Sequence, residues 1–169
     1  YGDYLCFKRA YEGTFNRIGN VELSSEVFAL AFDSSGRLYV GGHFTNAGNI
    51  AGADYVARWN GFAWEALGTG VNNDATCIVV INNDVYILGR FTSAGGLMLS
   101  DRIAIWSDGT WRPIDINLPG TVATYSILPA SDGSLYIGGA FSTVGETPDE
   151  NAKCGIVSDR VFTLGVTSA

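Results

Sequence analysis

Residues 41–48 read Gly41-Gly42-His43-Phe44-Thr45-Asn46-Ala47-Gly48, and the chain repeats this pattern twice. The second copy is Leu88-Gly89-Arg90-Phe91-Thr92-Ser93-Ala94-Gly95, and the third is Gly138-Gly139-Ala140-Phe141-Ser142-Thr143-Val144-Gly145. The phenylalanines of successive copies lie 47 and 50 residues apart. An internal period of about 40 to 50 residues is typical of proteins in which each repeat forms one small unit that packs on the next.

A second motif follows each copy of the first. It reads Trp59-Asn60-Gly61-Phe62-Ala63-Trp64, and in the next copy Trp106-Ser107-Asp108-Gly109-Thr110-Trp111. The last copy, Val157-Ser158-Asp159-Arg160-Val161-Phe162, has neither tryptophan. The N-terminal residues fit only this second half, because Tyr4-Leu5-Cys6-Phe7 and Thr14-Phe15-Asn16-Arg17-Ile18-Gly19 read as two strands around a turn.

Each copy contains four strand signals, which in the first complete copy cover residues 27–32, 38–44, 55–59 and 62–67. Asn60-Gly61, Asp108-Gly109 and Asp132-Gly133 predict tight hairpins, in which both central residues adopt a positive φ. The apolar spacing of a helix is not sustained anywhere in the chain. The sequence therefore predicts an all-β fold, a β-propeller segment of three four-stranded antiparallel blades preceded by the second half of another blade.

The blades are expected to belong to one propeller domain. The half blade, with strands three and four, covers residues 1–25, and the three full blades cover 26–74, 75–120 and 121–169. Three and a half blades do not close a ring, and open sheet edges invite further strands. The expected partners are therefore the remainder of a longer chain or neighbouring subunits.

The repeated large and small residues are expected to join the blades. The glycine pair lets a neighbouring strand or blade approach closely, and the phenylalanine that follows fills the space between blades. The paired tryptophans, five residues apart across a turn, are expected to touch across two strands. The predicted repeat core is Phe44, Phe91, Phe141, Trp59, Trp64, Trp106 and Trp111.

The two motifs together, Gly-Gly-x-Phe-Thr-x-Ala-Gly and Trp-Asn-Gly-x-x-Trp-x-x-Leu-Gly, resemble a kelch-like propeller repeat. Such repeats occur in bacterial and phage surface proteins and in fungal cortical proteins, and the resemblance covers residues 3 to 166. It implies a large extracellular protein, an adhesin or an appendage subunit. It says little about function, because a fold of this kind hosts many functions.

Charge and hydropathy exclude two classes of partner. The net charge is −7, and the ten basic residues are scattered along the chain. Nucleic acid, which requires clustered lysine and arginine, is therefore not expected as a partner. No apolar run approaches the roughly 20 residues of a membrane span, so no membrane insertion is expected. Low charge with many small polar residues favours an extracellular, cell-surface or virion and appendage location.

Few residues could carry catalysis or bind a metal. The single histidine is His43, and Arg90 and Ala140 fill its place in the other copies, where the side chain is expected to face a surface or the channel. A hydrolytic triad or a copper or zinc site needs further histidine or cysteine partners. We therefore predict no catalytic, cofactor-binding or metal-binding residues and no enzymatic activity.

The cysteines and the repeated aspartates have structural interpretations with one alternative each. Cys6, Cys77 and Cys154 form no CxxC pair and are expected to be small buried apolar residues, or to pair with a cysteine outside the chain.

Asp54 and Asp101 occupy equivalent positions before the third strand. They are expected to hold that turn by bonds to the backbone, with calcium coordination as the alternative.

Two sets of loop residues are candidates for a ligand or partner surface. The first contains the polar and aromatic residues Tyr11, Asn72 and Asn73, and the second is the apolar cluster Leu97, Met98 and Leu99. A glycan or a protein is the possible ligand. The sequence favours a non-enzymatic structural or adhesive segment, with a carbohydrate-binding propeller module or a non-catalytic fragment of a larger secreted enzyme as alternatives.

Overall fold

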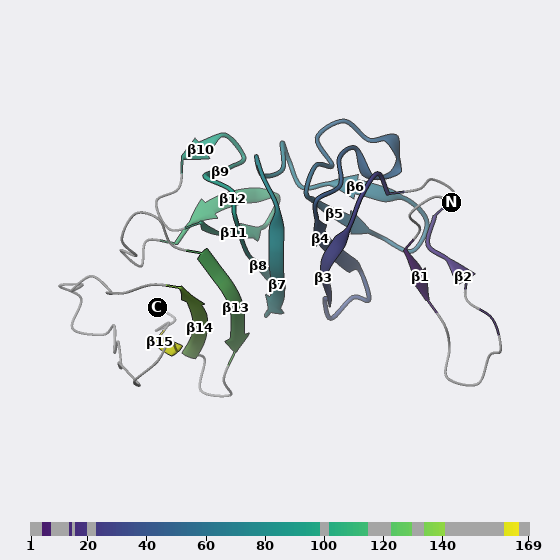
Figure 1. The fold of residues 1–169 in the computed structure, drawn as a ribbon. Helices are drawn as coiled ribbons and strands as arrows, with labels where there is room; N and C mark the ends of the chain where they lie inside the picture. Colours follow the sequence, from purple (N-terminus) through teal and green to yellow (C-terminus); the bar gives the residue numbers. More distant parts are fainter. Residues whose placement is uncertain are drawn as a thin grey trace.

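The computed structural model describes residues 5–7, 14, 16–19, 23–98, 102–114, 123–129, 134–140 and 161–165. Within these ranges the chain forms antiparallel β-sheets, and the one helical element is the single turn η1 (Ala47–Asn49) (Figure 1). The prediction of an all-β fold with four-stranded antiparallel sheets is confirmed.

The first four-stranded sheet follows chain order from one edge to the other. Its strands are β3 (Val27–Phe32), β4 (Leu38–Gly42), β5 (Val56–Trp59) and β6 (Trp64–Ala66). The side chains of β3 point alternately to the two faces, and those at 28, 30 and 32 are exposed while their neighbours are partly covered. The predicted limits of this first strand agree with the structure.

The second four-stranded sheet repeats this order. Its strands are β7 (Ala75–Ile81), β8 (Asp84–Gly89), β11 (Ile103–Ser107) and β12 (Thr110–Pro113). The long connection between its second and third strands contains a small hairpin of β9 (Ser93–Ala94) and β10 (Leu97–Met98). In the first sheet the corresponding connection contains η1, so the connections differ while the sheets match.

The two ends of the chain form smaller sheets. β1 (Cys6–Phe7) pairs with β2 (Asn16–Arg17), and β13 (Ala123–Pro129) pairs with β14 (Ser134–Ala140) and through it with β15 (Val161–Gly165). We expected residues 161–165 to form the fourth strand of the last copy, but they pair directly with the second strand, β14. The tryptophan pair that joins strands three and four in the other copies is absent from the last copy. No tryptophan contact therefore holds residues 161–165 in the fourth position of the sheet.

The tight turns were predicted only in part. Asp108 and Gly109 have φ of 49° and 77°, as the predicted hairpin requires. At Asn60-Gly61 only the glycine has a positive φ, so the prediction for Asn60 is wrong. The Asn60 side-chain oxygen instead accepts hydrogen bonds of 2.9 Å from the backbone N–H groups of Phe62 and Ala63. This side-chain contact lets the turn form with Asn60 in an ordinary backbone conformation. The turn predicted at 132–133 lies outside the described residues.

The sheets lie side by side, with β7 between β3 and β13 (Figure 1). An added Cβ at Gly41 would lie 2.9 Å from the backbone oxygen of Ala75, so the glycine permits the close approach of β7 that the sequence predicted. Phe91 is fully buried in an apolar cluster to which both the first and second sheets contribute. Phe44 is fully buried in a separate cluster that Leu5 and other residues of the N-terminal segment cover. Phe141 lies outside the described residues.

Candidate functional site

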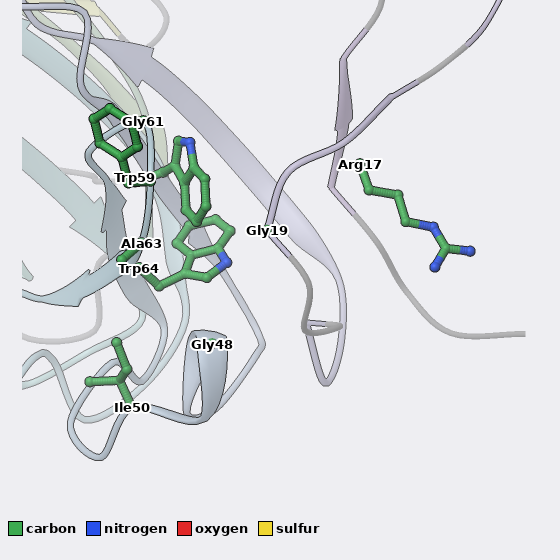
Figure 2. A pocket seen from close by; sticks show the side chains of 9 residues that line it. Arg17, Gly19, Gly48, Ile50, Trp59, Gly61, Ala63 and Trp64 are labelled. Carbon is green, nitrogen blue, oxygen red and sulfur yellow. The ribbon is translucent and has the colours of Figure 1, made fainter.

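Two indole rings at the outer end of the first sheet line a pocket of about 470 Å³. Trp59 and Trp64 are directly opposite each other on β5 and β6, with ring centroids 5.5 Å apart and planes inclined by 62°. Figure 2 shows the two rings side by side and the Arg17 side chain turned away from them. We call this the tryptophan pocket, and its lining side chains are Arg17, Ile50, Trp59, Phe62, Ala63 and Trp64.

Glycines on either side hold the Trp64 indole in place. An added Cβ would come within 2.6 Å of the ring at Gly48 and within 2.9 Å of the ring nitrogen at Gly19. Contacts this short do not occur for real Cβ atoms, so only glycine fits at either position. Gly48 is the last residue of the first repeat motif, and Gly19 belongs to the N-terminal segment. The sequence reasoning explained neither glycine by a contact with tryptophan.

The second sheet repeats this arrangement with one difference. Trp106 and Trp111 are opposite each other on β11 and β12, with centroids 5.3 Å apart, and Gly95 lies against the Trp111 ring. The Trp111 ring nitrogen donates a 2.8 Å hydrogen bond to the backbone oxygen of Leu67. In the tryptophan pocket, by contrast, the Trp64 ring nitrogen is buried and has no hydrogen-bond partner.

The unpartnered indole N–H of Trp64 distinguishes the first tryptophan pair from the second. Buried N–H groups are nearly always satisfied, and the Trp64 N–H, which lies against Gly19, is an exception. Small-molecule sites combine an apolar, aromatic lining of roughly 300 to 1,000 Å³ with a few polar groups. A sugar ring, which has an apolar face and hydroxyl groups, matches these two features.

The predicted loop surface is held together largely by its own hydrogen bonds. Asn72 Oδ1 accepts from the backbone N–H groups of Thr92 and Ser93 at 2.9 and 3.0 Å, and its Nδ2 donates to Thr92 Oγ1 at 3.1 Å. Asn73 Oδ1 accepts from the next backbone N–H at 2.8 Å. The amide of Asn72 is therefore engaged within the chain.

The apolar part of that predicted surface lies beside Asn72. Leu97 and Met98 form β10, where they are 43% and 79% exposed, and Met98 is opposite Ser93, which Asn72 contacts. The structure thus brings Asn72, Leu97 and Met98 together at the β9–β10 hairpin. Tyr11 and Leu99, which were predicted with them, lie outside the described residues.

His43 has a partner that the sequence did not reveal. Its Nδ1 makes a hydrogen bond with Asp74 Oδ1, and Arg90 Nη1 lies 3.5 Å from the other carboxylate oxygen of the same residue. The side chains of His43 and Arg90 are 55% and 67% exposed, whereas that of Asp74 is 7% exposed. A buried carboxylate therefore joins the matching positions of two successive sheets. In the described part of the chain, no hydroxyl group is hydrogen-bonded to the His43 ring to complete a triad.

The other carboxylates make structural contacts. Asp54 Oδ1 accepts a 2.7 Å hydrogen bond from the Asn46 backbone, which is the side-chain to backbone contact predicted for it. Asp33 accepts from the backbone N–H groups of Ser35 and Arg37 and from Arg37 Nε at 2.6 Å. Burial raises the pKa of Asp33, but these hydrogen bonds and the Arg37 charge outweigh it, so that the pKa lies below its ordinary value.

Metal ligands and thiols are sparse in the described ranges. No group of three or more His, Cys, Asp or Glu side chains there is placed to hold a metal ion. Cys77 is partly buried, and burial raises the pKa of its thiol. Cys6 is exposed, so the expectation of a buried apolar residue is wrong at that position. Asp101 and Cys154 lie outside the described residues.

Comparison with known proteins yields no relative, since no family model, curated protein or solved structure matches this chain. Among the residues that the structure describes, no helix is long and apolar enough to cross a membrane.

Proposed function

We propose that the chain is a segment of a kelch-like β-propeller with a non-enzymatic structural or adhesive role at a cell, virion or appendage surface. The observation that supports it is that the repeated motif residues are used to join one sheet to the next. Gly41 admits β7, Phe91 fills the space between the first two sheets, and Trp111 is hydrogen-bonded to Leu67 across them. Residues whose contacts join one repeat to the next serve to hold a structural scaffold together.

The surface location supplies the test. Immunogold labelling of the intact native source with an antibody against this chain is expected to decorate the outer surface of cells, virions or appendages. Label that is seen only after sectioning, inside cells or particles, would overturn the proposal. An antibody against a known internal protein of the same source is the control, because it must label sections alone.

Carbohydrate binding is a second candidate function, which the aromatic lining of the tryptophan pocket favours. On this proposal, a glycan array is expected to give a signal that Trp59→Ala reduces by about tenfold or more, the equivalent of about 1.4 kcal/mol. Trp106→Ala is the matched control, because it removes the corresponding indole of the second sheet and leaves the pocket intact. No signal at high protein concentration, or an equal loss in both variants, would contradict this candidate.

A further inference from the structure

The turn between β5 and β6 departs from the repeat at one position. In both four-stranded sheets this turn lies between the two paired tryptophans, and the third residue after the first tryptophan is Phe62 in one sheet and Gly109 in the other. Phe62 is 92% exposed, whereas Gly109 has no side chain. The first sheet therefore presents an aromatic ring to water where the second sheet has none.

The exposed ring belongs to the tryptophan pocket. Phe62 lines this pocket together with Trp59 and Trp64. An apolar side chain stabilises a fold in proportion to the surface that it removes from water, so a ring that is 92% exposed adds little to the stability of the sheet. Its surface is instead available to a ligand in the pocket.

The turn that carries Phe62 is held by a chain of polar contacts. Asn60 Oδ1 accepts hydrogen bonds of 2.9 Å from the backbone N–H groups of Phe62 and Ala63, and Asn60 Nδ2 donates to Glu65 Oε1 at 2.6 Å. Glu65 Oε2 in turn accepts from Arg58 Nε at 2.7 Å. Burial raises the pKa of Glu65, but its hydrogen bonds with Asn60 and Arg58 outweigh this effect, so the pKa lies below its ordinary value. The backbone of Phe62 is thus fixed before a ligand arrives, which lowers the cost of binding.

The remainder of the pocket wall is polar and uncharged. Gly19, Gly48 and Gly61 line it, and a glycine has no side chain to cover its own peptide groups. An acyl chain or an apolar side chain of a partner would bury such peptide groups without hydrogen bonds, whereas hydroxyl groups can bond to them. Arg17, the one charged residue in the described lining, is turned away from the indole rings (Figure 2). The wall therefore favours an uncharged ligand that carries hydroxyl groups.

We propose that Phe62 is the platform on which an uncharged pyranose stacks the C–H face of its ring, with its hydroxyl groups turned to the glycine-lined wall. This inference rests on carbohydrate binding as the second candidate function, and it names the class of sugar and the residue that selects it. A β-galactoside or a β-glucoside fits, because several C–H bonds lie together on one face of the ring and form an apolar surface for the phenyl group.

The test is an NMR titration with methyl β-D-galactopyranoside and methyl β-D-glucopyranoside as the probes. The unaltered chain is expected to bind at least one of them, and saturation transfer is expected to be strongest to the hydrogens of the C–H face. Phe62→Leu keeps an apolar side chain but removes the ring, so it is expected to weaken binding by about fivefold or more. Phe62→Tyr keeps the ring and is expected to bind within about twofold of the unaltered chain.

Two controls separate the platform from other effects. Circular dichroism is expected to show all variants folded, because the Phe62 side chain is 92% exposed. Trp106→Ala removes an indole of the second sheet and is expected to leave binding of the probe unchanged. A chain that binds neither probe, or a Phe62→Leu variant that binds as tightly as the unaltered chain, would overturn the inference.

The outcome for the platform is distinct from the outcome for carbohydrate binding itself. If Trp59→Ala lowers the glycan-array signal while Phe62→Leu does not, the pocket binds a sugar and Phe62 is not its platform. If the array gives no signal, the candidate function fails as well. Surface labelling of the native source is independent of both results.

Discussion

Replacing Phe91 by alanine is expected to lower the free energy of unfolding by about 3–5 kcal/mol. Phe91 has no exposed surface and lies in the cluster between the first and second sheets, which also contains Leu67, Val71 and Ile87. Truncation removes the transfer free energy of the ring and leaves a cavity that the two sheets cannot easily close. Because a domain of this size is stable by about 5–15 kcal/mol, the change is a large part of the total.

Urea unfolding followed by tryptophan fluorescence measures this effect. Phe62→Ala is the matched control, because it removes the same atoms from a side chain that is 92% exposed, and its effect is expected to stay within about 0.5 kcal/mol. If Phe91→Ala costs no more than Phe62→Ala, the phenylalanine of the repeat motif does not stabilise the contact between sheets.

The sequence predicted the sheets because their signals are local. The strand signal of residues 27–32 and the tight turn at Asp108-Gly109 depend only on neighbouring residues, and both agree with the structure. The last strand was misplaced because residues 161–165 can pair with any open edge of suitable direction, and strand pairing is a choice made in three dimensions. The Asn60 turn was misjudged because a side-chain hydrogen bond replaced the expected backbone conformation.

The candidate site was harder to predict than the sheets. The contact between Trp59 and Trp64 followed from their spacing across a turn. The pocket beside them did not, because it requires Gly19 and Gly48 to approach the Trp64 ring from distant parts of the chain. The partner of His43 was missed for the same reason: Asp74 lies 31 residues further on, at the start of the next sheet. Contacts between repeats depend on how the sheets pack, which the periodicity does not specify.

Replacing Gly89 by alanine is expected to destabilise the protein by about 3 kcal/mol or more, at or above the upper end of the usual cost of adding a methyl group to a packed interior. The added Cβ would lie 1.9 Å from the backbone oxygen of Asp74 and 3.0 Å from the Cα of Ala75. These backbone atoms, at and just before the start of the paired strand β7, cannot rotate away as a side chain can. The first sheet has the same requirement, because a Cβ at Gly42 would lie 2.1 Å from the backbone oxygen of Glu26.

The comparison that isolates this clash is Gly109→Ala. Gly109 has open space around the position of a Cβ, and its cost of about 1–2 kcal/mol comes from a φ of 77° alone. Urea unfolding is expected to rank Gly89→Ala clearly below Gly109→Ala in stability. Equal costs would mean that β7 yields to the added methyl group. Close backbone approach would then not be the physical reason for the second glycine of the motif.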